Sequence, residues 1–224
     1  MAEPQVSELM VRGIVVGVFA ENCWIIGSRR TREGIVIDPG DQPEEILALA
    51  RDMGLNVKVI ANSHAHLDHI LGVRGVQEAT GAKFLLHPQD LPIARSVSST
   101  AAPWMGQAVE PPPEPDGLLS DGDEVKVEGL TLKVIHTPGH TPGSVSYYTE
   151  GMLFSGDTLF QGSIGRTDLP GGDYGQEMSS IVERLLALPD DTMVLPGHMR
   201  ETKIGIEKET NPFVLEELAR RRGK

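Results

Sequence analysis

The sequence predicts an α/β fold, with strands in two groups and helices between and outside them. Two patterns lead to this prediction. Short apolar or alternating runs of strand length stop at glycine and proline, and between them lie amphipathic segments with helical spacing. A length of 224 residues suits one domain of moderate size or two small ones. Because no low-complexity linker divides the chain, we predict a single domain over residues 1–224.

The first half of the chain alternates strand and helix patterns. Pro39 and Gly40 stop one apolar run, and the helix that follows has Pro43 in its first turn and Gly54 just beyond its end. One face of that helix carries Ile46, Leu49, Ala50 and Met53. We predict strands at 11–18, 23–27, 34–38, 57–61 and 83–86, and helices at 43–53 and 70–80.

The middle segment, residues 88–120, is rich in proline, serine and alanine and includes the run Pro111-Pro112-Pro113-Glu114-Pro115. Such a run favours a stiff extended conformation over a helix. We predict an irregular segment here, either a functional lid or a connection. Its apolar residues Trp104 and Met105 are explained at least as well by packing on the core as by contact with a substrate.

Regular structure is predicted again after Gly122. The patterns indicate strands at 124–127, 130–135, 144–149, 152–154 and 192–195, and a helix at 176–188. The apolar face of that helix is formed by Met178, Ile181, Val182, Leu185 and Leu186. Asn211 and Pro212 are the N-cap and first-turn residues of a last helix.

Composition limits the partners of the chain. The net charge is −12, and Lys and Arg cluster only in the short run at 29–32 and in the last few residues, so we expect no nucleic-acid partner. No apolar stretch reaches membrane-spanning length, and the acidic start lacks the basic and apolar regions of a signal peptide. We therefore expect a cytoplasmic protein without a membrane partner. The single cysteine, Cys23, fits a buried apolar role. Assembly into a homo-oligomer is left open.

The segment His64-Ala65-His66-Leu67-Asp68-His69, called the hexad below, is the most informative stretch of the chain. It directly follows the strand predicted at 57–61. Three later residues also follow predicted strands, namely His140, Asp157 and His198. One such histidine alone is more often structural, but the constellation reverses those odds. Five histidines and two aspartates suffice to hold two divalent metals if one carboxylate bridges them. His87 and His136 fall outside this set.

The pattern H-x-H-x-D-H followed by isolated His, Asp and His resembles the metallo-β-lactamase fold superfamily. The chain looks most like short bacterial glyoxalase II-like proteins, the hydroxyacylglutathione hydrolase group. The resemblance extends from about Val11 to Phe213 and includes the stretch GDTLFQGSIGRTDLPGGD, the later P-G-H, Thr202 and Glu207. It implies a four-layer αβ/βα sandwich with two metals at the sheet edges, cleaving thioesters such as S-lactoylglutathione.

The resemblance also implies which residues bind each of the two metals. The first metal is expected to bind His64, His66 and His140, and the second to bind Asp68, His69 and His198. Asp157 is expected to bridge both, together with a water or hydroxide. Imidazole and carboxylate suit zinc, with iron or manganese as alternatives. Two metals that share a water lower its pKa to about 7, and Asp68 becomes the catalytic candidate because it can also accept a proton from that water.

Two further residues have alternative interpretations. Arg166 is a candidate for substrate binding, where it would hold an anionic group, but it could equally pair with Asp168 or Asp173. Asp38 could orient a metal ligand, or it could simply form the turn before Pro39.

Three functions from different classes fit the sequence. The hydrolase is favoured, because thiolates leave without prior protonation and the motif segments offer no obvious acid for an amide nitrogen. We therefore expect thioester cleavage with weak or no β-lactam turnover. The main alternative is a persulfide dioxygenase, a resembling group with a single iron at the positions of His64, His140 and Asp157. The third is a metal-bound scaffold or sensor. Full-length glyoxalase II enzymes carry an added C-terminal region for glutathione, so this resemblance does not imply glutathione specificity.

Overall fold

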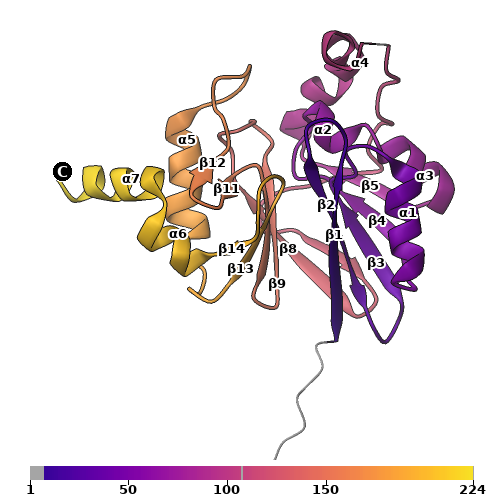
Figure 1. Cartoon of the computed structure of the whole chain (residues 1–224), viewed down its shortest axis with the longest axis horizontal. Helices are drawn as coiled ribbons and strands as arrows, with labels where there is room; N and C mark the ends of the chain where they lie inside the picture. The colour runs from indigo at the N-terminus through magenta and orange to yellow at the C-terminus, as the bar shows by residue number, and fades with distance from the viewer. Residues whose placement is uncertain (1–7, 107, 224) are drawn as a thin grey trace, which may run out of the picture.

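Two six-stranded sheets pack face to face, and helices cover the outer face of each (Figure 1). The structure is a computed structural model that describes residues 8–106 and 108–223. The strand order is β1-β2-β3-β4-β5-β6 in one sheet and β14-β13-β10-β9-β8-β7 in the other. This is the four-layer αβ/βα sandwich that the sequence predicts.

The first sheet and its helices come from the N-terminal half of the chain. Its strands are β1 (Leu9–Val16), β2 (Glu21–Ser28), β3 (Glu33–Ile37), β4 (Asn56–Ala61), β5 (Lys83–Leu86) and β6 (Gly117–Leu118). Its helical segments are α1 (Pro43–Asp52), α2 (Leu67–Ile70), α3 (Val73–Thr80), η1 (Pro88–Asp90) and α4 (Leu91–Met105). From β3 to β6 the neighbouring strands are parallel, so their carboxyl ends meet at one edge.

The second sheet follows in the C-terminal half. Its strands are β7 (Glu124–Val127), β8 (Leu130–His136), β9 (Val145–Thr149), β10 (Met152–Gly156), β13 (Met193–Pro196) and β14 (Thr202–Lys203), with a separate ribbon of β11 (Leu159–Phe160) and β12 (Ser163–Ile164). Its helical segments are α5 (Tyr174–Ser179), the π-helical η2 (Ser180–Leu185), α6 (Ile204–Thr210) and α7 (Pro212–Arg222). Figure 1 shows α5, α6 and α7 on the outer side away from α1 and α3.

Three apolar clusters hold the layers together. Along β3, Ile35 and Ile37 face the second sheet, whereas Val36 faces the helices, as the two-residue period of a strand requires. The cluster between the sheets also includes Tyr147 and Phe154. The predicted apolar faces of the helices at 43–53 and 176–188 are confirmed, since their side chains belong to the two outer clusters.

The largest difference from the sequence prediction lies in residues 88–120. Residues 91–105 form the helix α4 rather than irregular structure, and Pro103 lies inside it. The prediction holds for the proline run at 111–115, which has no regular structure. The sequence pattern also does not indicate the short elements β6, β11, β12, β14 and α6.

The helix predicted at 70–80 is confirmed as α3 over 73–80, and the separate short helix α2 precedes it at 67–70. The chain turns between them at Gly72, whose N–H donates to the carbonyl oxygen of Pro39 at 2.9 Å. A Cβ at Gly72 would lie 2.7 Å from that oxygen, so only glycine allows this approach. The second half of the hexad lies in α2, and the contact at Gly72 holds this helix close to the loop after β3.

No helix within residues 8–106 and 108–223 is both long enough and apolar enough to cross a membrane. The expectation of no signal peptide rests on the first residues of the chain, and positions 1–7 lie outside the described ranges.

Candidate metal centre

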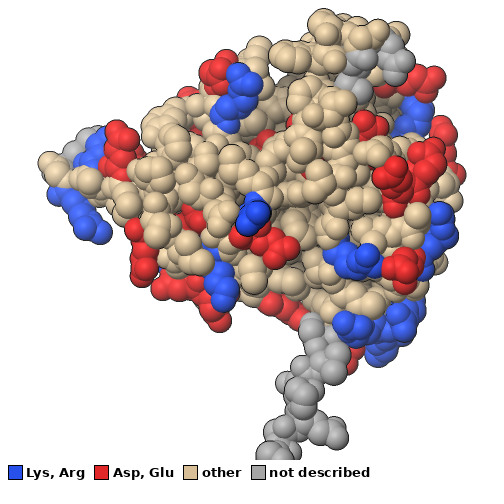
Figure 2. Space-filling model, in the orientation of Figure 1, with Lys and Arg blue, Asp and Glu red and all other residues tan. Residues whose placement is uncertain are grey.

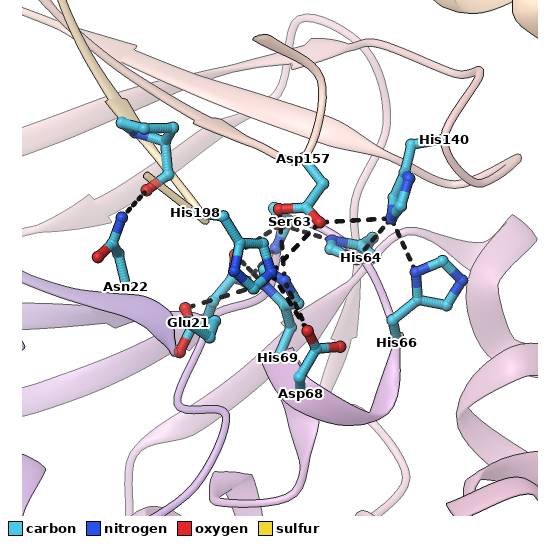
Figure 3. Close-up of polar contacts among 12 residues, drawn as sticks. Glu21, Asn22, Ser63, His64, His66, Asp68, His69, His140, Asp157 and His198 are labelled. Atoms are coloured by element: carbon cyan, nitrogen blue, oxygen red, sulfur yellow. Dashed lines mark hydrogen bonds and ion pairs between the residues drawn. The ribbon is translucent and has the colours of Figure 1, made fainter. Parts of the chain in front are cut away.

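The seven predicted ligands converge at the edge where strands of both sheets end (Figure 3). The hexad follows β4, and the single ligands follow β8, β10 and β13. Strands from both sheets therefore end with their ligands at one place. This agrees with the sequence, in which each candidate ligand follows a predicted strand. In Figure 3, Asp157 lies between His64, His66 and His140 on one side and Asp68, His69 and His198 on the other.

The first group consists of three imidazoles whose nitrogens point at one another. His140 Nε2 lies 2.8 Å from His66 Nδ1 and 3.2 Å from His64 Nε2. These separations suit nitrogens converging on one ion with bonds of about 2 Å. The three side chains form one of the clusters whose ligand atoms lie within 4.8 Å of one another.

The second group contains Asp68, His69 and His198, which form another such cluster. Asp68 Oδ2 lies 3.2 Å from His198 Nε2 and 3.9 Å from His69 Nε2. Asp157 joins the two groups, because its Oδ2 is 3.6 Å from Nε2 of both His140 and His198. Its Oδ1 is 3.4 Å from His69 Nε2. One carboxylate therefore faces both groups, which is the geometry of a bridging ligand.

Backbone and carboxylate oxygens hold the imidazole rings in place. His140 Nδ1 lies 2.7 Å from the carbonyl oxygen of Arg166. His69 Nδ1 lies 3.1 Å from Asp38 Oδ2, and Asp38 also accepts hydrogen bonds from the N–H and hydroxyl of Ser63. A metal-binding histidine ordinarily donates its other ring nitrogen in this way. Asp38 therefore orients a candidate ligand, and the simple turn-forming alternative does not describe it fully.

The pKa values of the histidines differ between the two groups. Burial, together with the neighbouring imidazoles, lowers the pKa of His66 to about 3 and holds the pKa of His64 well below its usual value. Burial acts in the same direction at His69, but the charges of Asp157 and Asp68 outweigh it and raise the pKa of that imidazole. His64 and His66 are therefore neutral near pH 7, as metal ligands must be, whereas His69 would exchange its proton for a metal.

The polar atoms at the centre fit a pair of divalent metals. His69 Nε2 and Asp157 Oδ1 are buried 3.4 Å apart, and neither makes a hydrogen bond of normal geometry with the described residues. Buried polar atoms without partners are rare, and a bound ion is one of the causes. The donor set of imidazole and carboxylate suits zinc, iron or manganese and does not discriminate among them.

Asp90 is a supporting residue that sequence reasoning missed. It is fully buried at the start of α4 and accepts hydrogen bonds from Ala65 N–H, from the hydroxyl of Thr141 and from Gly143 N–H. These donors come from the hexad and from the loop of His140. Asp90 thus ties both ligand-bearing loops to α4. Its partners are 25 to 53 residues away in sequence, so no local pattern signals the role.

We expect Asp90→Ala to destabilise the protein by about 3 kcal/mol, because it leaves three buried donors without an acceptor. It should also weaken metal binding, since both ligand loops lose a shared support. Urea unfolding of the metal-free protein and zinc titration would measure the two effects. Asp191 is exposed, so Asp191→Ala is the matched control. Equal stability and equal zinc affinity of the two variants would show that Asp90 does not support the ligand loops.

Arg166 lies at the mouth of the centre and forms a two-pronged ion pair with Asp168, at 2.8 Å for each nitrogen–oxygen contact. Arg166 also lines the adjoining pocket, where a substrate could reach it. Its role in substrate binding stays a prediction. His87 and His136 stack on each other with ring centres 4.3 Å apart and belong to none of the ligand clusters found in the described residues.

The metal centre opens into a pocket of about 760 Å³. Five of the candidate ligands line it, namely His66, Asp68, His140, Asp157 and His198. A volume in this range suits a small-molecule ligand. The arrangement is thus a candidate two-metal site at the floor of a pocket, which can bring a water and a substrate carbonyl together.

Known proteins with established structures share this fold. The chain resembles the BLEG-1 B3 metallo-beta-lactamase with a TM-score of 0.85 and 36% identity, over 92% of this chain and 99% of that one. The structure of TTHA1623 in a di-iron-bound form matches with a TM-score of 0.81 and 40% identity, over 90% of this chain and 99% of that one. ETHE1 from Myxococcus xanthus matches with a TM-score of 0.76 and 29% identity, over 91% of this chain and 83% of that one.

Sequence comparison agrees with the structural likeness. The hydroxyacylglutathione hydrolase GloC of Haemophilus influenzae is 35% identical over 210 residues, which cover 90% of this chain and 96% of that protein. The model of the metallo-beta-lactamase superfamily matches residues 16–198, from the end of β1 to the last candidate ligand. The fold of that family binds divalent metals through a cluster of histidine and aspartate of the kind described above. The chain therefore belongs to the metallo-beta-lactamase superfamily.

Proposed function

We propose that this protein is a metal-dependent hydrolase that cleaves a thioester, with S-acylglutathione such as S-lactoylglutathione, or a related activated ester, as the substrate. The observation that carries this proposal is the pair of ligand groups sharing Asp157 at the floor of a pocket. Two divalent ions, zinc in the first place and iron or manganese as alternatives, fit these donors. We place the enzyme in the cytoplasm, with a small molecule as its partner and neither nucleic acid nor membrane.

The chemistry follows from the residues at the pocket floor. Two divalent ions held there would supply a water of lowered pKa and an electrophile for the carbonyl. Asp68 lies 20% exposed beside His198, where it can accept the proton of that water. Hydrolysis breaks the carbon–sulfur bond and gives a carboxylate and a thiol, with release of one proton.

The pocket favours a leaving group that needs no acid. Apart from the candidate ligands, Arg166 is the one titratable residue among the described residues that line it. His136 is held by the carbonyl of Pro142 at 2.9 Å, and the Tyr147 hydroxyl donates to the carbonyl of Asn62. A thiol has a pKa near 8.5 and leaves as a thiolate, whereas an amide nitrogen must first be protonated. This supports thioesters over peptides and β-lactams.

The experiment is metal analysis of the isolated protein together with assays on thioesters, a β-lactam and glutathione persulfide. We expect two metals per chain, thioester cleavage and weak or no β-lactam turnover. The likeness to GloC supports a thioester as the substrate, whereas the likeness to the BLEG-1 metallo-beta-lactamase makes the assay with a β-lactam necessary. Cleavage of the β-lactam but not of thioesters would overturn the proposal.

A mononuclear-iron persulfide dioxygenase is the second candidate, and the likeness to ETHE1 favours it. The two candidates differ in their need for the second ligand group. His198→Ala should remove one of two metals and most thioester cleavage from a hydrolase. It should leave the single iron of a dioxygenase, which needs only His64, His140 and Asp157. Oxygen uptake with glutathione persulfide, one iron per chain and no thioester cleavage would establish the second candidate.

We expect Arg166→Ala to leave the metal content unchanged, because its contact with His140 is made by the backbone carbonyl. It should raise KM for acidic thioesters by up to about fivefold and leave KM for neutral ones nearly unchanged, as the loss of one exposed ion pair predicts. Asp168→Ala is the complementary variant, since it frees Arg166 and should lower KM for acidic substrates. Equal effects on both substrate classes would assign Arg166 a purely structural role.

A further inference from the structure

One wall of the pocket is a stripe of side chains along α4. Ile93, Val97, Thr100 and Trp104 recur at helical spacing and all line the pocket. Trp104 is 69% exposed, although it is the largest apolar side chain of the helix. In Figure 2 the surface at the top right, where Figure 1 places α4, is largely uncharged. The helix thus presents an apolar face to the space above the metal centre.

The opposite wall and the rim are also apolar. The wall after β10 contributes Phe160, Ile164, Leu169 and Pro170 to the lining. At the rim, Phe19 packs edge-on against Trp104 with ring centres 6.2 Å apart, and Met199 is 57% exposed. Exposed apolar side chains that gather around a pocket mark a place where an apolar ligand binds.

Charged groups for recognition are scarce in this pocket. Among the described residues that line it, the carboxylates belong to the candidate metal centre and the cation is Arg166 alone. Arg166 already pairs with Asp168 through two contacts. Glutathione carries two carboxylates and one ammonium group, and desolvating such charges without partners is costly. The lining therefore favours an uncharged, apolar group over the peptide part of glutathione.

From this lining we infer that the substrate carries an apolar arm of several carbons, which lies between α4 and the 160–170 wall while the scissile carbonyl sits at the metal centre. This inference rests on the proposed thioester hydrolysis and names its substrate class. The arm belongs either to the acyl group or to the thiol. Within the proposed class of thioesters and activated esters, S-lactoylglutathione, with a short polar acyl group and a charged thiol, would then be cleaved more slowly than a thioester that carries such an arm.

The test compares two series of thioesters. In the first, N-acetylcysteamine, a small neutral thiol, carries acetyl, butanoyl, hexanoyl or decanoyl groups. In the second, acetyl is joined to ethanethiol, butanethiol, hexanethiol or octanethiol. Each buried methylene contributes about fourfold, so kcat/KM should rise at least tenfold along one series. The series that rises identifies the side of the arm, and flat or falling values in both would overturn the inference.

Variants of α4 connect the preference to this wall. In whichever series rises, Ile93→Ser and Trp104→Ala should each lower the ratio of kcat/KM for the six-carbon member to that for the two-carbon member by at least about threefold, because they remove apolar contacts with the arm. Ser99→Ala is the matched control, since Ser99 is exposed on the same helix and does not line the pocket. An unchanged ratio in Ile93→Ser and Trp104→Ala would place the arm elsewhere.

Binding of non-hydrolysable thioethers separates this inference from the proposed function. S-decyl-N-acetylcysteamine should bind the metal-loaded protein at least tenfold more tightly than S-ethyl-N-acetylcysteamine in calorimetry. Tight binding of the decyl compound without cleavage of any thioester would refute the hydrolase and retain the apolar site. Cleavage of thioesters without any dependence on chain length, and with equal binding of both thioethers, would retain the hydrolase and refute the apolar arm.

Discussion

Replacing Asp157 by alanine should remove both metals from the protein. Its carboxylate faces His140 of the first group and His69 and His198 of the second, at 3.4 to 3.6 Å. Each group would lose a donor, and the centre would lose a negative charge that offsets the ions. Loss of an outer hydrogen-bond partner of a metal ligand typically costs about 10–100-fold in metal affinity. Loss of a donor shared by both groups should exceed this, with a metal-to-protein ratio near zero after dialysis.

The control for this prediction is Asp168→Ala. Asp168 follows in the same segment, is exposed and pairs with Arg166 rather than with a candidate ligand. This variant should keep two metals per chain in elemental analysis and should fold like the wild type. If Asp157→Ala also retained two metals, Asp157 would not be the shared ligand, and each group of three would have to hold its metal alone.

Much of the candidate site can be predicted from the sequence, because its signals are local. The hexad concentrates four ligands in six residues, and the short strand before it ends at Ala61. The same strand-then-ligand pattern precedes His140 and Asp157, and the carboxyl ends of strands from both sheets meet at one edge. Strand periodicity and strand ends thus indicate the place of the ligands without knowledge of the topology.

The helix α4 could not be predicted because its composition and its packing point in opposite directions. Pro103, the serines and the proline run at 111–115 indicate irregular structure. In the fold, Pro103 lies near the end of the helix, and Ala94, Val97 and Ala101 are buried against the first sheet and its helices. The packing of these three buried side chains outweighs the preference of the local sequence for irregular structure. The pocket wall therefore became visible only in the structure.

The close approach of the hexad to the loop after β3 is a second feature that composition hides. Gly40 is buried next to the backbone of Asp68, and a Cβ at Gly40 would lie 1.7 Å from the carbonyl oxygen of Asp68. The same Cβ would lie 2.9 Å from Glu21 Oε2, a carboxyl whose pKa is raised by burial. Neither the backbone of α2 nor this buried side chain has free space to move into. The sequence shows only a Pro-Gly turn at this position.

Gly40→Ala should therefore cost more than about 3 kcal/mol of stability, beyond the usual range for an overpacked core, because the clash involves backbone. Relief of the clash must shift Asp68 and His69, so the second ligand group should lose its metal before the first. Urea unfolding of the metal-free protein and zinc titration would measure both effects. Gly81→Ala is the matched control, since its Cβ meets nothing within 4 Å and only its positive φ of 67° carries strain, at about 1–2 kcal/mol. If Gly40→Ala were no less stable than Gly81→Ala and bound two metals normally, the contact between this loop and α2 would not position the second group.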